Sequence, residues 1–226
     1  MAHVVFAIGV FLATHIALAE NPVRGWMVRG LGERPFAWIY GAVAILQLIW
    51  IGHAVDAAPT MPYWQPPAWT AAIPLFIMPL ALLLLVCGFT QNNPTASLAS
   101  GRLARREVTG ILAITRHPVM WGLGLWSLAH LAVVADLAEA LRYAAFAVLA
   151  LLFLPRIEAK QRAKWGAAAW TEFTARTSSL PFGALVQGRT RLDWREIGWV
   201  RIAATIALYL ALILWLHPKV IGQPVW

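Results

Sequence analysis

Long apolar stretches without a single charged residue limit the fold of this chain more than any other feature. Five of them have the length of a membrane span, at residues 1–19, 35–55, 69–89, 117–135 and 202–218. A helix needs about 20 residues to cross the hydrocarbon core of a bilayer. A sixth, weaker span carries Glu139 and Arg142 near one end. We therefore predict an all-α, polytopic membrane helix bundle with six transmembrane helices, at 2–19, 36–55, 69–89, 117–135, 137–154 and 202–218.

The composition excludes a soluble domain of the same length. Hydrophobic residues make up 60% of the chain and charged residues 12%, against roughly 45–50% and about 25% in globular domains. The surplus apolar surface predicts contact with a lipid bilayer. The single cysteine, Cys87, excludes a disulfide framework, a thiolate zinc cluster and an iron–sulfur site.

The basic residues indicate how the predicted spans are oriented. Sixteen of the 18 Lys and Arg fall in alternate connections: Arg24, Arg29 and Arg34 in the first, Arg102, Arg105, Arg106 and Arg116 in the third, and Arg156, Lys160, Arg162, Lys164, Arg176, Arg189, Arg191, Arg195 and Arg201 in the fifth. Cytoplasmic loops carry such an excess, so we expect both termini on the periplasmic side of a bacterial inner membrane. This pattern explains the net charge of +8 without nucleic acid as a partner.

The segment 155–200 is the longest stretch outside the predicted spans. Its first part, 156–176, is rich in Ala, Lys, Arg and Glu, and it carries Trp165, Trp170 and Phe173. We expect a cytoplasmic helix lying at the membrane interface, with these aromatic side chains toward lipid. Nothing in the chain suggests a second domain, so 1–226 is predicted to be one domain.

Two histidines, His15 and His130, fall inside predicted spans. An ionisable residue within a membrane is energetically costly, so its presence there suggests a functional role. Each ring could bond a neighbouring helix, or the two could hold haem b between helices. Small residues on these spans permit close approach: Gly9, Ala13, Gly122 and Gly124. Counted from the span centres, the two rings differ in depth by about 13 Å, and shifting each helix by four residues would bring them level. His3 with His130, or His15 with His117, match better in depth.

The string Thr115-Arg116-His117-Pro118 stands where the fourth span begins. Arg116 and His117 form a cationic, proton-capable pair that could bind an anionic group or orient a substrate. The alternative is a basic anchor followed by proline at the first helical position, where the missing N–H costs nothing. The remaining histidines, His3, His53 and His217, lie near the opposite ends of their spans, where bonds to headgroups or water are expected.

Several strings resemble the NnrU family of bacterial membrane proteins, which includes the plant 15-cis-zeta-carotene isomerases. They are T-H-I-A-L-A around His15, G-L-G-E-R at 30–34, I-T-R-H-P-V-M-W-G-L-G-L-W-S-L-A-H-L at 114–131, R-T-S-S-L-P-F at 176–182 and Q-G-R at 187–189. The third and fourth are the specific ones. Order and spacing agree over almost the whole chain.

The resemblance implies an integral membrane protein associated with denitrification, in expression or assembly of nitrite and nitric oxide reduction. For the isomerase branch it implies haem b, with iron ligands that fall on His15 and His130 here. Arg116 and His117 would then neutralise haem propionates or a substrate anion. The plant enzymes carry a cysteine three residues before the second histidine, where this chain has Ser127, so ligand exchange with that cysteine is excluded.

A more distant resemblance, to membrane methyltransferases of the isoprenylcysteine carboxyl type, keeps a second function open. Those proteins carry R-H-P-x-Y at a helix mouth and, later, an arginine with two glutamates around S-adenosylmethionine. Here Met120 replaces the tyrosine, and Arg156-Ile157-Glu158 offers one glutamate. The third reading is a non-enzymatic assembly factor for a respiratory reductase. A lipophilic substrate is expected only for the two enzymatic readings.

Overall fold

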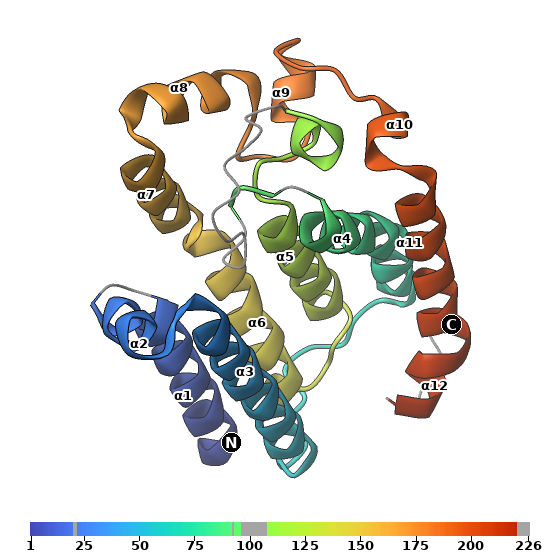
Figure 1. The fold of residues 1–226 in the computed structure, drawn as a ribbon. Coiled ribbons are helices and arrows are strands. Elements are labelled where there is room, and N and C mark those ends of the chain that lie inside the picture. Colours follow the sequence, from blue (N-terminus) through green and yellow to red (C-terminus); the bar gives the residue numbers. More distant parts are fainter. Residues whose placement is uncertain (20–21, 92, 96–107, 221–226) are drawn as a thin grey trace.

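The computed structural model describes residues 1–19, 22–91, 93–95 and 108–220 (Figure 1). The predicted all-α class is confirmed, because the described chain consists of helices, their connections and one isolated bridge between Pro62 and Asp136. The elements are α1 (Ala2–Ala19), α2 (Val23–Leu31), α3 (Glu33–Asp56), η1 (Ala68–Ala71), α4 (Ala72–Thr90), η2 (Gly110–Ala113), α5 (Pro118–Leu131), α6 (Leu137–Leu152), α7 (Leu154–Trp165), α8 (Ala167–Arg176), α9 (Gly183–Val186), α10 (Trp194–Ile197), α11 (Trp199–Ala211), the π-helical turn η3 (Leu212–Leu216) and α12 (His217–Val220).

Five stretches of helix in the described chain are long and apolar enough to cross a membrane: Ala2–Ala19, Glu33–Asp56, Ala68–Thr90, Leu137–Trp165 and Trp199–Lys219. Each contains or overlaps a predicted span. The predicted span at 117–135 is instead the 14-residue helix α5, which covers only about 21 Å. It begins after His117, whose φ of −122° and ψ of 55° are not helical. That the chain crosses the membrane six times therefore stays a prediction.

The connections between helices that the sequence assigns to the same side of the membrane lie together in the structure. At one end, Leu137 N donates to Met61 O at 3.0 Å and Tyr63 N donates to Ala135 O at 3.1 Å, which joins the α3–α4 and α5–α6 connections. At the other end, here called the basic end, the start of α5 meets the segment that follows α8. This alternation agrees with the predicted topology. Arg102, Arg105 and Arg106 lie outside the described residues.

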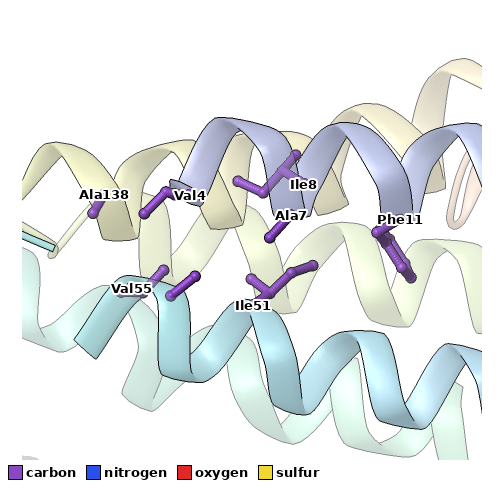
Figure 2. Close-up of a cluster of buried hydrophobic side chains, with 8 residues drawn as sticks. Val4, Ala7, Ile8, Phe11, Ile51, Val55 and Ala138 are labelled. Carbon is purple, nitrogen blue, oxygen red and sulfur yellow. The ribbon is translucent and has the colours of Figure 1, made fainter. Parts of the chain in front are cut away.

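Helices α1, α3 and α6 share one buried apolar cluster (Figure 2). Its members are Val4, Ala7, Ile8 and Phe11 of α1, Ile51, Ala54 and Val55 of α3, and Ala138 of α6. Small side chains at the centre of the cluster let the three helices approach closely, as interfaces between membrane helices require. The cluster fixes the beginning of α1 beside the end of α3 and the beginning of α6.

Helix α5 packs between α4 and α6, and glycines make that packing possible. A Cβ on Gly122 would lie 2.9 Å from the carbonyl oxygen of Ala81 in α4, and one on Gly124 would lie 2.7 Å from Leu151 Cδ2 in α6. The sequence therefore identified these two positions correctly as sites of close approach. Gly9 has no atom within 4 Å of the equivalent position, so it does not serve that purpose.

A proline inside α4 gives α11 its attachment. Pro79 lacks an N–H, so it leaves the carbonyl of Leu75, one turn earlier, without its helical donor. The hydroxyl of Tyr209 in α11 donates to that carbonyl at 2.9 Å. The Tyr209 hydroxyl thus satisfies a backbone carbonyl that lipid could not.

The segment after α6 differs from the expected interfacial helix. Its aromatic side chains were predicted to face lipid, but Trp170 and Phe173 of α8 are 6% and 1% exposed and pack with Leu112. Gly166, with a φ of +83°, breaks the predicted helix into α7 and α8. After this turn α8 packs on Leu112 of η2, just before α5, and burial of the two rings holds it there.

Candidate functional site

The two most specific strings of the sequence meet at the basic end. Arg116 N donates to Ser178 O at 2.9 Å, and Phe182 N donates to Ile114 O at 2.8 Å. The indole N–H of Trp121 donates to Ser179 O at 2.6 Å. The turn before α5 and the loop after α8 therefore form one hydrogen-bonded unit, although about 60 residues of chain lie between them.

One carboxylate oxygen joins both candidate side chains of this unit. Oε1 of Glu158, in α7, lies 2.8 Å from Nε of Arg116 and 2.9 Å from Nε2 of His117. The His117 side chain is fully buried, and those of Arg116 and Glu158 are 12% and 25% exposed. Glu158 lies beyond the apolar part of α6, where α7 becomes charged. The structure thus brings Arg116 and His117 together and adds a partner that the sequence suggested only through its more distant resemblance.

The carboxylate determines which nitrogen of His117 carries the proton. Hydrogen bonds from His117 and Arg116, together with the Arg116 charge, lower the pKa of Glu158 to about 2, against the opposing effect of partial burial. An ionised carboxylate can only accept hydrogen bonds, so Nε2 of His117 is the protonated nitrogen. Nδ1 then holds an unused electron pair, and within the described residues this buried atom has no hydrogen-bond partner.

Arg189, of the Q-G-R string, has a structural role. Its Nη1 donates to Thr174 O, Ala175 O and Thr177 O at 3.1, 2.8 and 2.7 Å. Carbonyls at the C-terminus of a helix lack intrahelical donors, so this guanidinium caps α8. Arg116 Nη1 also donates to Thr177 O, at 3.3 Å, which ties the cap to the Glu158 cluster.

His15 lies elsewhere, between α1 and α3. Its Nε2 is 2.7 Å from the hydroxyl of Tyr40, and its ring contacts those of Phe11 and Tyr40 at centroid distances of 5.2 and 5.0 Å. One residue earlier, Thr14 bonds Gln47 of α3, with Nε2 of Gln47 donating to the Thr14 hydroxyl at 2.8 Å. Both bonds join the same pair of helices. The position of His15 therefore agrees with the first of the two alternatives from the sequence, in which its ring bonds a neighbouring helix.

His130 lies near the other end of α5, beside α6. Its Nδ1 is 2.8 Å from the carbonyl oxygen of Trp126, so Nδ1 is the donor and Nε2 carries the free electron pair. The ring stacks on Tyr143 with centroids 5.2 Å apart and planes inclined by 25°. A hydrogen bond of this kind orients imidazoles that bind metals.

An aromatic stack separates the two intramembrane histidines. Phe146 of α6 contacts Phe11 on α1 at 5.6 Å and Trp126 on α5 at 5.8 Å. His15 comes one turn after Phe11 and His130 one turn after Trp126, and α1 and α5 run in opposite directions. The two rings therefore differ in depth by about 12 Å.

One iron needs its two imidazole nitrogens on the order of 4 Å apart, since imidazole–metal bonds are about 2 Å long. His15 and His130 do not fit a shared haem iron in this arrangement. Nor do Arg116 and His117 lie beside His130, because they stand 13 or more positions before it along α5, which corresponds to about 20 Å.

The other histidines form no metal site in the described part of the chain, where no group of three or more His, Cys, Asp or Glu is placed to hold an ion. Nε2 of His3 accepts a hydrogen bond from the indole of Trp50 at 2.9 Å. This bond links the ends of α1 and α3, so His3 has a structural partner within the chain.

A model of the family described as NnrU protein matches residues 3–225 of the chain. No curated protein and no solved structure matches it. The match includes both specific strings and all residues of the Arg116–His117–Glu158 cluster.

Proposed function

Because this chain belongs to the NnrU family, we propose that it is an isomerase-like enzyme of the bacterial inner membrane in which His117 transfers protons. One observation supports the proposal: Nε2 of His117 is bonded to Glu158, while its buried Nδ1 has an unused electron pair. A base held by a carboxylate, away from water, is a recurring arrangement for general acid–base catalysis. The substrate we propose is lipophilic, because the five membrane-length helical stretches favour a protein that meets its substrate within a bilayer.

The proposed reaction moves a proton between two carbons of the substrate. Nδ1 of His117 takes a proton from a carbon next to a double bond or carbonyl, and that C–H electron pair enters the conjugated system. The imidazolium then returns the proton at another carbon, so no electrons are gained or lost. Glu158 stabilises the imidazolium, and Arg116 keeps Glu158 ionised. Proton transfer of this kind contributes about 10²- to 10⁴-fold to rates.

Deuterium exchange tests this function without a known substrate. The protein is purified in detergent and incubated in D₂O with a lipid extract of its own membrane, and mass spectrometry follows deuterium in the lipids. We expect the wild type to label at least one lipid. His117→Asn should abolish labelling, and Glu158→Gln should slow it about 10²-fold or more.

The matched control is His53→Asn, at an exposed histidine of the opposite end, which should label at the wild-type rate. Equal labelling by wild type and His117→Asn contradicts the proposal. So does a wild type that labels nothing while native lipids are present.

The denitrification role implied by the resemblance is part of the proposal. A protein that serves nitrite and nitric oxide reduction would act beside a respiratory reductase in the same membrane. Deleting the gene should lower nitrite or nitric oxide turnover, and His117→Asn should fail to restore it. Full restoration by His117→Asn, with a reductase subunit co-purifying, favours the assembly-factor reading instead.

Haem b, the second implied feature, stays a prediction for this chain. Haem would supply an iron with one or two imidazole ligands and two propionates. Of the two predicted ligands, His130 has its Nδ1 bonded to the carbonyl of Trp126, so Nε2 would be the nitrogen that binds iron, and His15 has its Nε2 engaged by Tyr40. The absorption spectrum of detergent-purified protein tests this prediction.

Methyl transfer from S-adenosylmethionine is the second candidate, and the 2.8 Å contact between Arg116 and Glu158 favours it. The two side chains are 42 positions apart in sequence. Arg116 belongs to the R-H-P string of the more distant resemblance, and Glu158 stands where that resemblance has a glutamate around the cofactor. Calorimetry with S-adenosylmethionine decides: saturable binding, weakened at least 10-fold by Arg116→Ala or Glu158→Ala, selects methyl transfer. Absence of binding removes this candidate.

A further inference from the structure

Helix α2 lies at the edge of the apolar part of the molecule. It joins α1 to α3 at the basic end, and none of its nine residues is buried. Both neighbouring helices are long and apolar enough to cross a membrane, and Figure 1 shows α2 where α1 ends and α3 begins. We therefore place α2 at the level where these two helices leave the hydrocarbon core of a bilayer.

The protein itself fixes the position of α2 relative to α3. Gly32 is the only residue between the two helices, and its φ of +87° favours glycine. Nη2 of Arg24 in α2 lies 3.5 Å from Oε1 of Glu33 in α3. The same guanidinium lies 5.5 Å from the ring centre of Phe36, which is buried. Arg24 therefore has its partners within the chain.

The other two arginines of this region differ from Arg24. Arg29 and Arg34 are exposed, and neither forms a hydrogen bond or an ion pair with the described residues. Arg29 follows Trp26 by three positions in α2, and Arg34 precedes Trp38 by four in α3; these indoles are 71% and 79% exposed. Residues three or four apart are neighbours on a helix surface. Each helix thus presents a guanidinium next to an indole.

The exposed side chains of α2 combine the two properties of a helix at a membrane surface. Val23 and Leu31 are 39% and 46% exposed, and together with Trp26 they give one side of α2 an apolar character that lipid can cover. Tryptophan is enriched at the level of the lipid headgroups. A guanidinium binds phosphate through paired, charge-assisted hydrogen bonds.

We infer that Trp26, Arg29, Arg34 and Trp38, here called the α2 surface, bind the headgroups of anionic phospholipids. Residues 22–34 carry three arginines and one glutamate, and the pair of Arg24 with Glu33 leaves two positive charges. Phosphatidylglycerol offers a phosphate without a cation, whereas the ammonium groups of phosphatidylethanolamine and phosphatidylcholine are repelled by the arginines. The inference is independent of proton transfer by His117.

Fluorescence quenching by brominated lipid measures which headgroups surround α2. In a Cys87→Ser background, Leu31→Cys is labelled with a fluorophore and placed in nanodiscs of equal parts phosphatidylglycerol and phosphatidylcholine, with one of the two brominated. We expect phosphatidylglycerol to be enriched at the label about 5-fold or more, since each arginine near a membrane surface contributes about that factor. Arg29→Gln combined with Arg34→Gln should reduce the enrichment to about 2-fold or less.

Arg191→Gln combined with Arg195→Gln is the matched control, because it removes the same charge from exposed positions outside α2. The enrichment at the label should then be unchanged. Equal quenching by the two brominated lipids would show that the α2 surface does not select charge, and would overturn the inference. Quenching by neither lipid would overturn it as well, by showing that protein covers this surface. Enrichment that survives the loss of both Arg29 and Arg34 would also contradict it.

Discussion

Glu158 in α7 and His117, the residue before α5, are distant in sequence, and yet a carboxylate oxygen and Nε2 lie 2.9 Å apart, with the His117 side chain fully buried. Arg116 reaches the same oxygen from the side. With the carboxylate ionised and the imidazole neutral, the three groups have no net charge. This balance explains how they can be placed next to membrane spans.

Removing the carboxylate charge should destabilise the fold. In Glu158→Gln the guanidinium of Arg116 loses its counter-charge while remaining 12% exposed. An unpaired buried charge is costly, so we expect a loss of about 1–3 kcal/mol. The measurement is thermal unfolding in detergent. Glu172→Gln, in the exposed pair with Arg176, is the matched control and should change stability by under about 0.5 kcal/mol; equal effects of both variants would contradict the prediction.

The same carboxylate predicts a dependence of stability on pH. Its pKa in the folded protein, about 2, lies below the ordinary 4.5. A depressed pKa contributes stability that is fully present above the ordinary value and is lost as the pH falls toward the folded one. The melting temperature of wild type should therefore drop between about pH 5 and pH 2 more than that of Glu158→Gln. Parallel curves for the two proteins would exclude this contribution.

The contact of α5 with α4 predicts a contrast between two glycines. Gly122→Ala places a methyl group 2.7 Å from Leu85 and 2.9 Å from the Ala81 carbonyl, and the helices must separate. We expect a loss of about 1–3 kcal/mol. Gly9→Ala meets nothing within 4 Å and should be neutral or slightly stabilising. Thermal unfolding of the two variants side by side is the test, and a neutral Gly122→Ala would show that α4 and α5 are not this close.

The bond between His15 and Tyr40 should act as a link between α1 and α3. A double-mutant cycle of Tyr40→Phe and His15→Phe is expected to give a coupling of about 0.6–1.7 kcal/mol, the values that such cycles give for hydrogen bonds between membrane helices. Unfolding in mixed detergent measures it. Additive effects of the two changes would mean that the bond contributes nothing.

The predicted orientation can be read from thiol labelling in cells. In a Cys87→Ser background, Val186→Cys, at an 85% exposed position of the basic end, should react only after the inner membrane is permeabilised. Thr60→Cys, exposed in the α3–α4 connection, should react in intact spheroplasts. The opposite pattern would reverse the orientation that the arginines indicate.

Local patterns in the sequence predicted the helices well. Charge-free windows located α1, α3, α4 and α11, because each needs only its own apolar length, and α6 was predicted in spite of Glu139 and Arg142. The short α5 was overestimated: His117 and Pro118 end the preceding turn, and the helix stops at Leu131 before Asp136 caps α6. The aromatic side chains of α8 were placed wrongly because a helix pattern does not say whether its apolar face meets lipid or protein.

The site was less predictable, for a physical reason. Arg116 and His117 stood out as a cationic pair, but their shared partner is some 40 residues away, and no periodicity connects α5 with α7. For His15 and His130, residue counts from the span centres give a depth difference of about 13 Å, and counts from the level of Phe146 give about 12 Å. The sequence could not reveal Phe146 between the two histidines, because its position depends on how α6 packs.

Nitrogen NMR of protein labelled with ¹⁵N-histidine, at neutral pH in detergent, tests the central claim most directly. The signals lost in His117→Asn identify this ring. The account predicts a protonated Nε2 bonded to a carboxylate and an unprotonated Nδ1, with the Nε2 signal moving in Glu158→Gln. A proton on Nδ1, or an Nε2 signal indifferent to Glu158→Gln, would contradict it.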